Sequence, residues 1–384
     1  MRITYSYAED VNSAKLPRNL KNELLDVFSK YLHIPQSRTR RSSSALSFLT
    51  QRLRCLTLVS AIELLFNVGK YELTSIRNIK EKHVEYLIKS WTEQKLSRGT
   101  LENKISYLAT FACWLNKGNI VKHPDMYAEV KAIQKRSGIS EQDKSWSAAG
   151  INVNEMISRI AAEDQHIGVQ LMLQVEFGLR VQESMMLKPY DALSVIAGIR
   201  HISVSQGPKN NKFRKFPVLH ESQERVIELA QQLISRHHKS TIPDEYTLPE
   251  WKKRHNTVMI KFGITKNQLG VTSHGLRHEH FNDLYKDLTG VDSPVRGGEA
   301  PRSDILKAAR QIISEHAGHS VISKANAYIG SHAAMKAKTA KDLTNEQVLQ
   351  TLKECEGNKM KAAEKLGCAR SYLYKRLNEM KHPS

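Results

Sequence analysis

The chain has 384 residues, which is enough for two or three domains with sizeable hydrophobic cores. Hydrophobic residues make up 40% of it, and the longest apolar stretch, around residues 56–66, is interrupted by Ser60 and Glu63 and is too short to span a bilayer. These features exclude a membrane-spanning protein. The 58 Lys and Arg residues outnumber the 39 Asp and Glu residues, giving a formal net charge of +19, so a polyanion is the expected partner.

Nucleic acid is favoured over a membrane surface as that polyanion, because the sequence shows neither a basic amphipathic helix with an aromatic face nor a lipidation motif. The N-terminus has no basic region followed by an apolar run, so no secretory signal is predicted. The cysteines lack the CxxC spacing of a disulfide framework or zinc site; they are Cys55, Cys113, Cys355 and Cys368. A reducing cytosol is the expected environment. Charge alone leaves open a generically basic, soluble protein.

Residues 1–45 are predicted to be a lead-in that ends in a basic, serine-rich arm at 36–44, of a kind that can lie along phosphates. The clearest helix that follows is predicted from about Thr100 to Leu115, because apolar residues recur there every three or four positions. A similar stripe covers 73–91. Since no stretch is rich in β-formers, residues 46–134 are predicted to be an all-helical DNA-binding domain.

The polar segment 135–150 is predicted to be a linker. A second domain, mainly helical with one β-hairpin, is predicted over 151–335. Its elements in chain order are helices over 153–187, strands at 199–204 and 213–219 around a Gly/Pro/Asn turn, and helices at 221–236, 274–288 and 303–317.

Four separated segments of this second domain carry polar residues of the kinds that bind or attack phosphate. They are EFGLRVQES at 176–184, QGPKNNKFRKFPV at 206–218, SHGLRHEH at 273–280 and EHAGHSVISKANAYIG at 315–330. In the third, His274 and Arg277 are one helical turn apart and therefore share a face. In the fourth, Tyr328 follows His319 by nine residues.

This set closely resembles the tyrosine recombinase (phage integrase) family. The matches are a GLRxxE context, a lysine in a hairpin turn before a strand, an HxLRH box, and a GHS box with a tyrosine nine residues on. The residues at these positions are Arg180 and Glu183; Lys209, followed by Arg214 and Pro217; His274, Leu276, Arg277 and His278; and Gly318, His319, Ser320 and Tyr328. The resemblance covers roughly residues 50–335, with 104–120 in the place of the last helix of the family's core-binding domain.

The resemblance implies the chemistry of these residues. Tyr328 is the expected nucleophile, forming a 3′-phosphotyrosyl bond, and His274 the expected acceptor of its proton, since a phenol is protonated at neutral pH. Arg180 and Arg277 are expected to bind the non-bridging oxygens, a task that suits a planar, permanently charged guanidinium. Because the covalent link stores the energy of the phosphodiester, neither ATP nor a metal cofactor is expected.

Three further basic or polar groups complete the expected site. Lys209 is expected to protonate the leaving 5′ oxygen, His319 to hydrogen-bond the phosphate, and Glu183 to orient an arginine. Lys212 and Arg214 of the hairpin are expected to contact DNA phosphates, with a solvated turn as the alternative. His278 is expected to pack or bond locally.

Two features of the region leave other interpretations open. Zinc is one, since His274 and His278 are four residues apart, with His280, His316 and His319 nearby; however, no HExxH motif or Cys/carboxylate cluster completes a site, so no metal site is predicted. The other is the 45-residue separation of His274 and His319, longer than in compact members of the family. Residues 291–302 form the insertion, which could reach DNA, contact a partner subunit or be disordered.

The C-terminal segment 343–381 is predicted to form three short helices. Thr344 and Gln347 make a capping box for the first, and Gly357 and Gly367 separate the helices. The run EGNKMKAAEKLGCARSYLYKRL resembles a Fis-type helix-turn-helix, whose third helix enters the major groove. That implies DNA contacts from the side chains away from its core face, which are Arg370, Ser371, Tyr372, Lys375 and Arg376. A plain three-helix bundle with a solvated basic face is the alternative.

The fold class expected is therefore mainly α with a small β component: a SAM-like core-binding domain, a tyrosine recombinase catalytic domain and a C-terminal helix-turn-helix. The function expected is site-specific recombination or integration of DNA, in a mobile element or prophage of a bacterium, in the cytoplasm and associated with the nucleoid. The resemblance implies double-stranded DNA as partner, a homotetramer on two recombination sites and an accessory DNA-bending protein, with no membrane partner. A type IB topoisomerase and a non-catalytic DNA-binding regulator are the rival functions.

Overall fold

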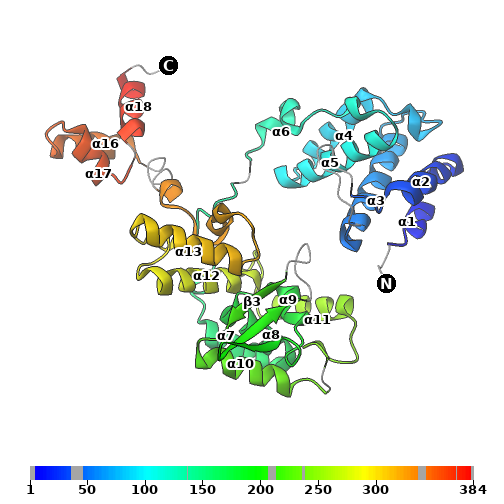
Figure 1. Cartoon of the computed structure of the whole chain (residues 1–384). Helices are drawn as coiled ribbons and strands as arrows, with labels where there is room; N and C mark the ends of the chain where they lie inside the picture. The colour runs from blue at the N-terminus through cyan, green and yellow to red at the C-terminus, as the bar shows by residue number, and fades with distance from the viewer. Residues whose placement is uncertain are drawn as a thin grey trace. The chain divides into compact units, whose positions relative to one another are not determined.

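The computed structural model describes residues 5–35, 46–135, 137–205, 213–235, 238–335, 343–368 and 370–381. The chain divides into two compact units, Met1–Arg136 and Ser137–Ser384 (Figure 1). Within the parts described, no helix has the length and apolar character needed to cross a bilayer. The basic arm predicted at 36–44 lies outside the described residues.

All the regular secondary structure that is described in the first unit is helical. One hydrophobic cluster forms its core, with Phe28, Trp91 and Phe111 almost fully buried. Serine hydroxyls begin two of its longer helices: Ser47 accepts the Thr50 N–H and Ser97 accepts the Thr100 N–H. Its helices are α1 (Ala8–Ser13), α2 (Arg18–Tyr31), α3 (Phe48–Glu63), α4 (Glu81–Glu93), α5 (Arg98–Trp114) and α6 (Ala128–Ala132), with a π-helical turn η1 (Leu64–Val68) and short 3₁₀ turns η2 (Ile76–Asn78), η3 (Gly118–Ile120) and η4 (Pro124–Met126).

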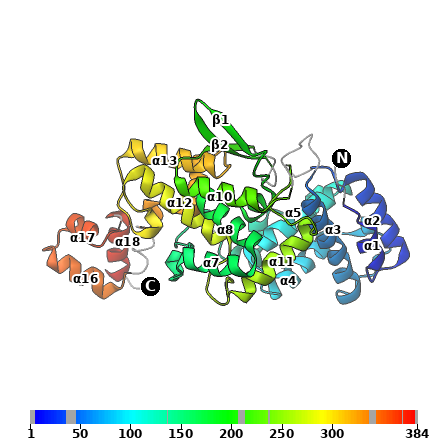
Figure 2. The same ribbon diagram turned by 90° about the horizontal axis from the view of Figure 1, so that it is seen from below.

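The larger part of the second unit is a helical body with one small sheet. Figure 2 shows the hairpin of β1 and β2 extending from the body that contains α8 and α10. The elements are η5 (Ser147–Ala149), α7 (Val153–Glu163), α8 (Gln165–Phe177), α9 (Val181–Met186), β1 (Leu193–Ile196), β2 (Ile199–Val204), β3 (Arg214–Pro217), α10 (Glu221–Gln232), α11 (Leu248–Lys261), α12 (His274–Thr289), η7 (Pro294–Arg296), α13 (Ser303–His316), η8 (Ile322–Ala325) and α14 (Asn326–Ile329).

The sheet is antiparallel in the order β1-β2-β3, with Leu193 opposite Ile202 and Val204 opposite Arg214. Its inner face packs on α8 and α10, because Ile202, Val204 and Phe216 share one core cluster with residues of both helices. The predicted hairpin of β2 and β3 is therefore present, but the sequence prediction missed β1. Ala197 and Gly198 both have positive φ angles and make the tight β1–β2 turn.

Helix α11 was also missed, although its start carries a clear signal. Thr247 donates from its hydroxyl to Glu250 Oε2, and the Thr247 N–H donates to the same oxygen, so the first turn is capped as in a capping box. Trp251 and Val258 on its inner face are buried against α7 and α8. Helices α10, α12 and α13 lie within a few residues of their predicted limits. The region predicted to be helical over 153–187 divides into α7, α8 and α9, and the short helix α14 was not predicted.

Three helices close the chain: α16 (Asn345–Glu354), α17 (Lys359–Lys365) and α18 (Arg370–Lys381). Thr344 and Gln347 form the predicted capping box, and Asn358 accepts the N–H groups of Met360 and Lys361 at the start of α17. The helices share a small core of their own around Val348, Leu366 and Leu373.

Candidate active site

The first element of the site is the turn between α8 and α9. Gly178 ends α8 with φ +56°, and a Cβ atom at this position would lie 2.5 Å from the His280 ring. Glycine is therefore required both for the left-handed backbone and for the close approach of α12. The turn places Arg180 at the start of α9, where its N–H donates to Glu183 Oε2 at 2.8 Å.

Glu183 is the electrostatic centre of the site. Its fully buried carboxylate accepts from Arg180 Nη1 at 2.6 Å and from Arg214 Nη1 and Nη2 at 3.0 and 2.6 Å, and Arg277 Nη1 lies 3.9 Å away. Burial alone would raise the pKa of this carboxyl, but the hydrogen bonds and charges of Arg214 and Arg180 outweigh it and lower the pKa to about 2. Glu183 thus positions more than one arginine.

Arg214 requires a correction of the sequence interpretation. It was expected on the hairpin as a contact to DNA phosphate, but its side chain is only 5% exposed and its guanidinium forms a two-pronged pair with Glu183. The strand alternation explains this, because Arg214 and Phe216 point to the buried face of β3 while Lys215 points outward. Arg214 therefore joins the sheet to α9 as a structural residue. Lys209 and Lys212 lie outside the described residues.

Arg277 is held at the carboxyl ends of two helices. It is fully buried, and its guanidinium donates to the carbonyl oxygen of Gly178 after α8 and to that of Ala317 after α13, the latter at 2.8 Å. Arg180 Nη2 donates to the same Ala317 oxygen at 2.8 Å. Helix carboxyl ends carry partial negative charge, which stabilises buried cations. Burial lowers the pKa of Arg277 to about 10, so it stays charged at neutral pH.

Tyr328 lies in the middle of this group. Its hydroxyl accepts a hydrogen bond from Arg277 Nε at 3.0 Å, and its ring packs on Phe281 with the centroids 4.6 Å apart. The ring centroids of His274 and His319 are each 6.3 Å from that of the tyrosine. The structure thus brings together five of the residues predicted to be catalytic, from three separate segments: Arg180, His274, Arg277, His319 and Tyr328.

His274 and His278 are neutral at physiological pH. Desolvation, followed by the charges of Arg277, Arg180 and Lys144, lowers the pKa of His274 to about 4. His278 is buried between His274 and Tyr328, and desolvation lowers its pKa to about 3. His280 and His316 act as packing residues, with ring nitrogens on the carbonyl oxygens of Val175 and Phe177. Among the described residues, no group of three or more His, Cys, Asp or Glu could hold a metal ion.

Gly318 of the GHS turn has φ +74°, and a Cβ atom there would lie 2.6 Å from Arg214 Nη1. We expect Gly318→Ala to lower the free energy of unfolding by about 1–3 kcal/mol for the backbone strain, with a further loss from displacing the guanidinium. Gly290→Ala is the matched control, because Gly290 has φ +75° and open space around it. Urea unfolding of both variants measures the difference. Equal losses would show that Arg214 does not restrict this position.

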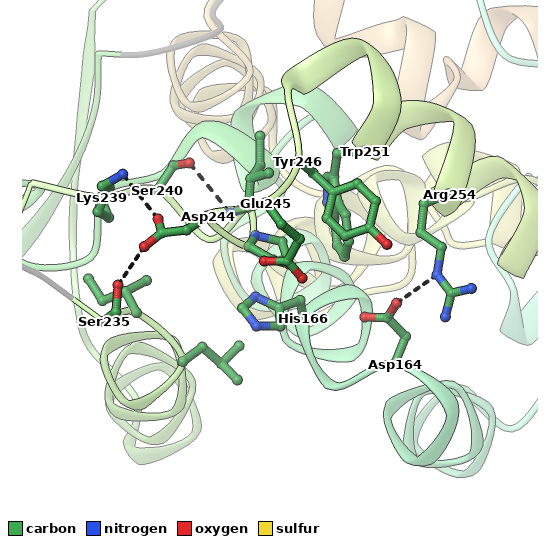
Figure 3. A pocket seen from close by; sticks show the side chains of 14 residues that line it. Asp164, His166, Ser235, Lys239, Ser240, Asp244, Glu245, Tyr246, Trp251 and Arg254 are labelled. Atoms are coloured by element: carbon green, nitrogen blue, oxygen red, sulfur yellow. Dashed lines mark hydrogen bonds and ion pairs between the residues drawn. The ribbon is translucent and has the colours of Figure 1, made fainter.

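A separate hollow of about 390 Å³ lies where α11 approaches the start of α8 and the end of α10 (Figure 3). His166, Tyr246 and Trp251 line it, and two of its carboxylates are paired within the chain: Asp164 with Arg254, and Asp244 with Ser235 and Lys239. It shares no residue with the arginine, histidine and tyrosine cluster, and we assign it no role.

Only some of the residues predicted to contact DNA from the third C-terminal helix are exposed. Arg370, Ser371 and Lys375 of α18 are exposed. Arg376 is instead held inside the small domain, because its guanidinium donates to Tyr372 Oη, Asn345 Oδ1 and the Leu343 carbonyl oxygen, each at 3.1 Å. Tyr372 and Arg376 therefore stabilise the packing of this helix on the chain before α16.

Two family models match parts of the chain. Residues 39–119 match the model described as phage integrase, N-terminal, and residues 342–380 match the model described as bacterial regulatory protein, Fis family. No protein in the curated set matches the sequence.

Solved structures with a similar fold are site-specific recombinases. The XerH site-specific recombinase bound to difH, in a pre-cleavage complex, has a TM-score of 0.51 at 15% identity, over 88% of this chain and 93% of that one. A lambda integrase dimer bound to a COC′ core site has a TM-score of 0.51 at 14% identity, over 79% and 76%. A lambda integrase tetramer on a Holliday junction gives 0.51 at 14%, over 83% and 80%.

These similarities define the class of fold. The chain has the mainly helical fold of the tyrosine recombinases, with a SAM-like N-terminal domain, one small sheet and a Fis-type helix-turn-helix, as the sequence predicts. At 14–15% identity the structural likeness shows the fold alone.

Proposed function

We propose that the protein is a tyrosine-type site-specific recombinase or integrase, which cuts and rejoins DNA through a 3′-phosphotyrosyl intermediate. The observation that carries this proposal is the hydrogen bond from Arg277 to the Tyr328 hydroxyl, with Arg180 on the same Ala317 carbonyl oxygen as Arg277 and the neutral imidazole of His274 near the tyrosine ring. A phenol held beside two guanidinium groups is placed to attack a phosphate that those groups bind.

In the proposed reaction the Tyr328 oxygen attacks the scissile phosphorus, and the bond from phosphorus to the 5′ oxygen breaks. Arg180 and Arg277 bind the non-bridging oxygens and stabilise the charge that develops on them. His274 takes the phenolic proton, and Lys209 supplies a proton to the leaving oxygen. Attack by a 5′ hydroxyl on the phosphotyrosine reverses these steps and rejoins a strand, so the phosphodiester energy is conserved.

The lowered pKa of His274 suits its proposed role. A general base must be unprotonated before the reaction, and a pKa of about 4 keeps this imidazole neutral at pH 7. The negative phosphate of bound DNA moves the pKa upward, which strengthens the base when the substrate is in place.

The rest of the chain supports a DNA-binding protein with accessory contacts. The net charge of +19 favours binding to duplex DNA, and the Fis-type domain adds a second contact region. Because one related structure is a lambda integrase tetramer on a Holliday junction, we propose a homotetramer that joins two sites and exchanges strands. Association with the bacterial nucleoid and help from a DNA-bending protein belong to the same proposal.

The test begins with selection of preferred sites from a library of random duplexes. The best site is then made as a duplex with a nick beside each candidate phosphate, so that cleavage releases a short fragment and traps the protein on DNA. With EDTA present and ATP absent, we expect a covalent adduct whose DNA-bound peptide contains Tyr328. Relaxation of plasmids without site preference would favour the topoisomerase, and tight binding without an adduct would favour the regulator.

We expect removal of all residues after Met335 to weaken binding to the selected site about tenfold, while the adduct still forms at saturating protein. The reason is that the C-terminal helices have their own core, separate from the one that contains Tyr328. Binding titrations and adduct yield measure the two effects. The full chain with Arg370, Ser371 and Lys375 all changed to alanine is the matched control, and it should lose affinity similarly. An adduct lost with the deletion would contradict this separation.

A further inference from the structure

Residues 140–147, part of the segment predicted to be a linker, form a strap between the two helices that carry His274 and Tyr328. At one end, the Ser140 N–H donates to the carbonyl oxygen of Asn326 at 2.8 Å, at the start of α14. At the other end, Trp146 is fully buried and its Nε1 donates to the carbonyl oxygen of Thr272 at 2.9 Å, just before α12. The strap therefore contacts both helices of the candidate site.

A partly buried ionic network holds the strap in place. Arg296, in the insertion 291–302, donates to Asp143 of the strap at 2.9 Å and to Glu279 of α12 at 2.8 Å, and it also pairs with Asp283. Glu279 in turn accepts the N–H of Ser147 at 3.0 Å. Because the guanidinium joins three carboxylates, it fixes the strap, the insertion and α12 to one another. The insertion thus has a structural function within its own chain.

The strap brings Lys144 to the edge of the site. The backbone oxygen of Lys144 packs on Gly275, where an added Cβ atom would lie only 2.7 Å from it, and Gly275 directly follows His274. The Lys144 side chain is exposed, as is His274. Its charge acts on the imidazoles of both His274 and His278 and lowers their pKa values, after the larger effect of desolvation.

We propose that Lys144 is a further DNA phosphate-binding residue of this active site, and that Arg296 is the residue that positions it. The proposal rests on the proposed recombinase function. Lys144 adds an exposed, strongly hydrated cation beside His274, in addition to the guanidinium groups of Arg180 and Arg277. An ammonium there is suited to the scissile phosphate or the phosphate next to it.

The same charge helps to keep His274 unprotonated. Several groups face His274: Arg277 and His278 from its own helix, Arg180 from the start of α9, Tyr328 from α14, and Lys144 from the strap. The ring of His319, after α13, lies 6.3 Å from that of Tyr328, centroid to centroid. Removing the Lys144 charge therefore raises the pKa of His274, while the two arginines continue to lower it. In a plot of cleavage rate against pH, the fall in rate on the acid side must then occur at higher pH.

The experiment compares the full chain with Lys144→Ala and Lys144→Arg on the nicked duplex. We expect Lys144→Ala to slow adduct formation at saturating DNA by tenfold or more, with the dissociation constant changed less than threefold and the acid side of the pH profile moved to higher pH. Lys144→Arg should restore most of the rate and return the acid side of the pH profile to its wild-type position. Thermal melting of each variant checks that the fold is intact.

A double-mutant cycle tests the role of Arg296. If Arg296→Gln slows cleavage by misplacing Lys144, its effect should be much smaller in the Lys144→Ala background than in the wild type. Unchanged rate and pH profile in Lys144→Ala would overturn the inference, and so would equal loss in Lys144→Arg, which would indicate packing. If the wild type itself forms no adduct, the proposed function fails, an outcome distinct from failure of the variants alone.

Discussion

Tyr328→Phe is expected to abolish the covalent adduct on nicked DNA, a loss of at least 10⁴-fold in rate, while the affinity for DNA changes less than threefold. The substitution removes only the phenol oxygen, the atom that accepts the hydrogen bond from Arg277 Nε and that the proposed mechanism uses as nucleophile. One hydroxyl contributes little to an affinity that many phosphate contacts supply. Denaturing gels measure the adduct, and binding titrations at fixed salt measure the affinity.

Tyr285→Phe is a matched control for that variant. Tyr285 is fully buried on α12 in the same hydrophobic cluster as Tyr328, and its hydroxyl lies 3.5 Å from His332 Nε2. Losing that oxygen tests for general damage to this core without touching the proposed nucleophile. We expect the control to form the adduct at nearly the wild-type rate. Adduct formation by Tyr328→Phe would assign the chemistry to another residue.

Glu183→Gln is expected to lower the free energy of unfolding at pH 7 by about 3–5 kcal/mol, since it leaves buried guanidinium groups without their countercharge. Arg214 and Arg277 are 5% and 0% exposed and cannot turn to water without repacking. Urea unfolding measures the loss. Glu224→Gln is the control, because its pair with Arg200 is partly exposed and contributes less than about 1 kcal/mol.

The same residue predicts how stability depends on pH. Folding lowers the pKa of Glu183 from its ordinary 4.5 to about 2, so its carboxylate stabilises the folded protein fully above pH 4.5 and loses this effect as the pH falls toward 2. Wild-type stability should therefore fall across this range with a component that Glu183→Gln lacks. Parallel pH profiles for the two proteins would contradict the assignment.

The helices with clear apolar periodicity could be predicted from the sequence. The helix predicted from Thr100 to Leu115 is α5 (Arg98–Trp114), and the three-helix C-terminal segment lies at its predicted limits. In both cases capping residues and glycines mark the ends locally, and those signals depend on nearby residues alone. β1 was missed because its residues do not alternate between buried and exposed, as those of β3 do.

The grouping of Arg180, His274, Arg277, His319 and Tyr328 could be predicted only through family resemblance, since no periodicity brings residues so far apart in sequence together. The resemblance did not predict which of the side chains are buried or with which groups they pair. Arg214 lies in a basic hairpin, yet strand alternation buries it against Glu183. Trp146 was the overlooked signal in the polar segment, because a tryptophan among polar residues commonly marks a point of burial.

The hydrogen bond between Arg277 and the Tyr328 hydroxyl has a consequence for the protein before it meets DNA. In the proposed mechanism the Arg277 guanidinium binds the phosphate, but before DNA binds it donates a hydrogen bond to the phenol oxygen of Tyr328. An arriving phosphate therefore competes with the phenol for the Arg277 guanidinium. Arg277 then exchanges the phenol for the phosphate as its hydrogen-bond acceptor, so substrate binding and release of the phenol occur in one step. If the proposed mechanism holds, the Tyr328 oxygen stays hydrogen-bonded to Arg277 until DNA binds, and the DNA phosphate itself releases it.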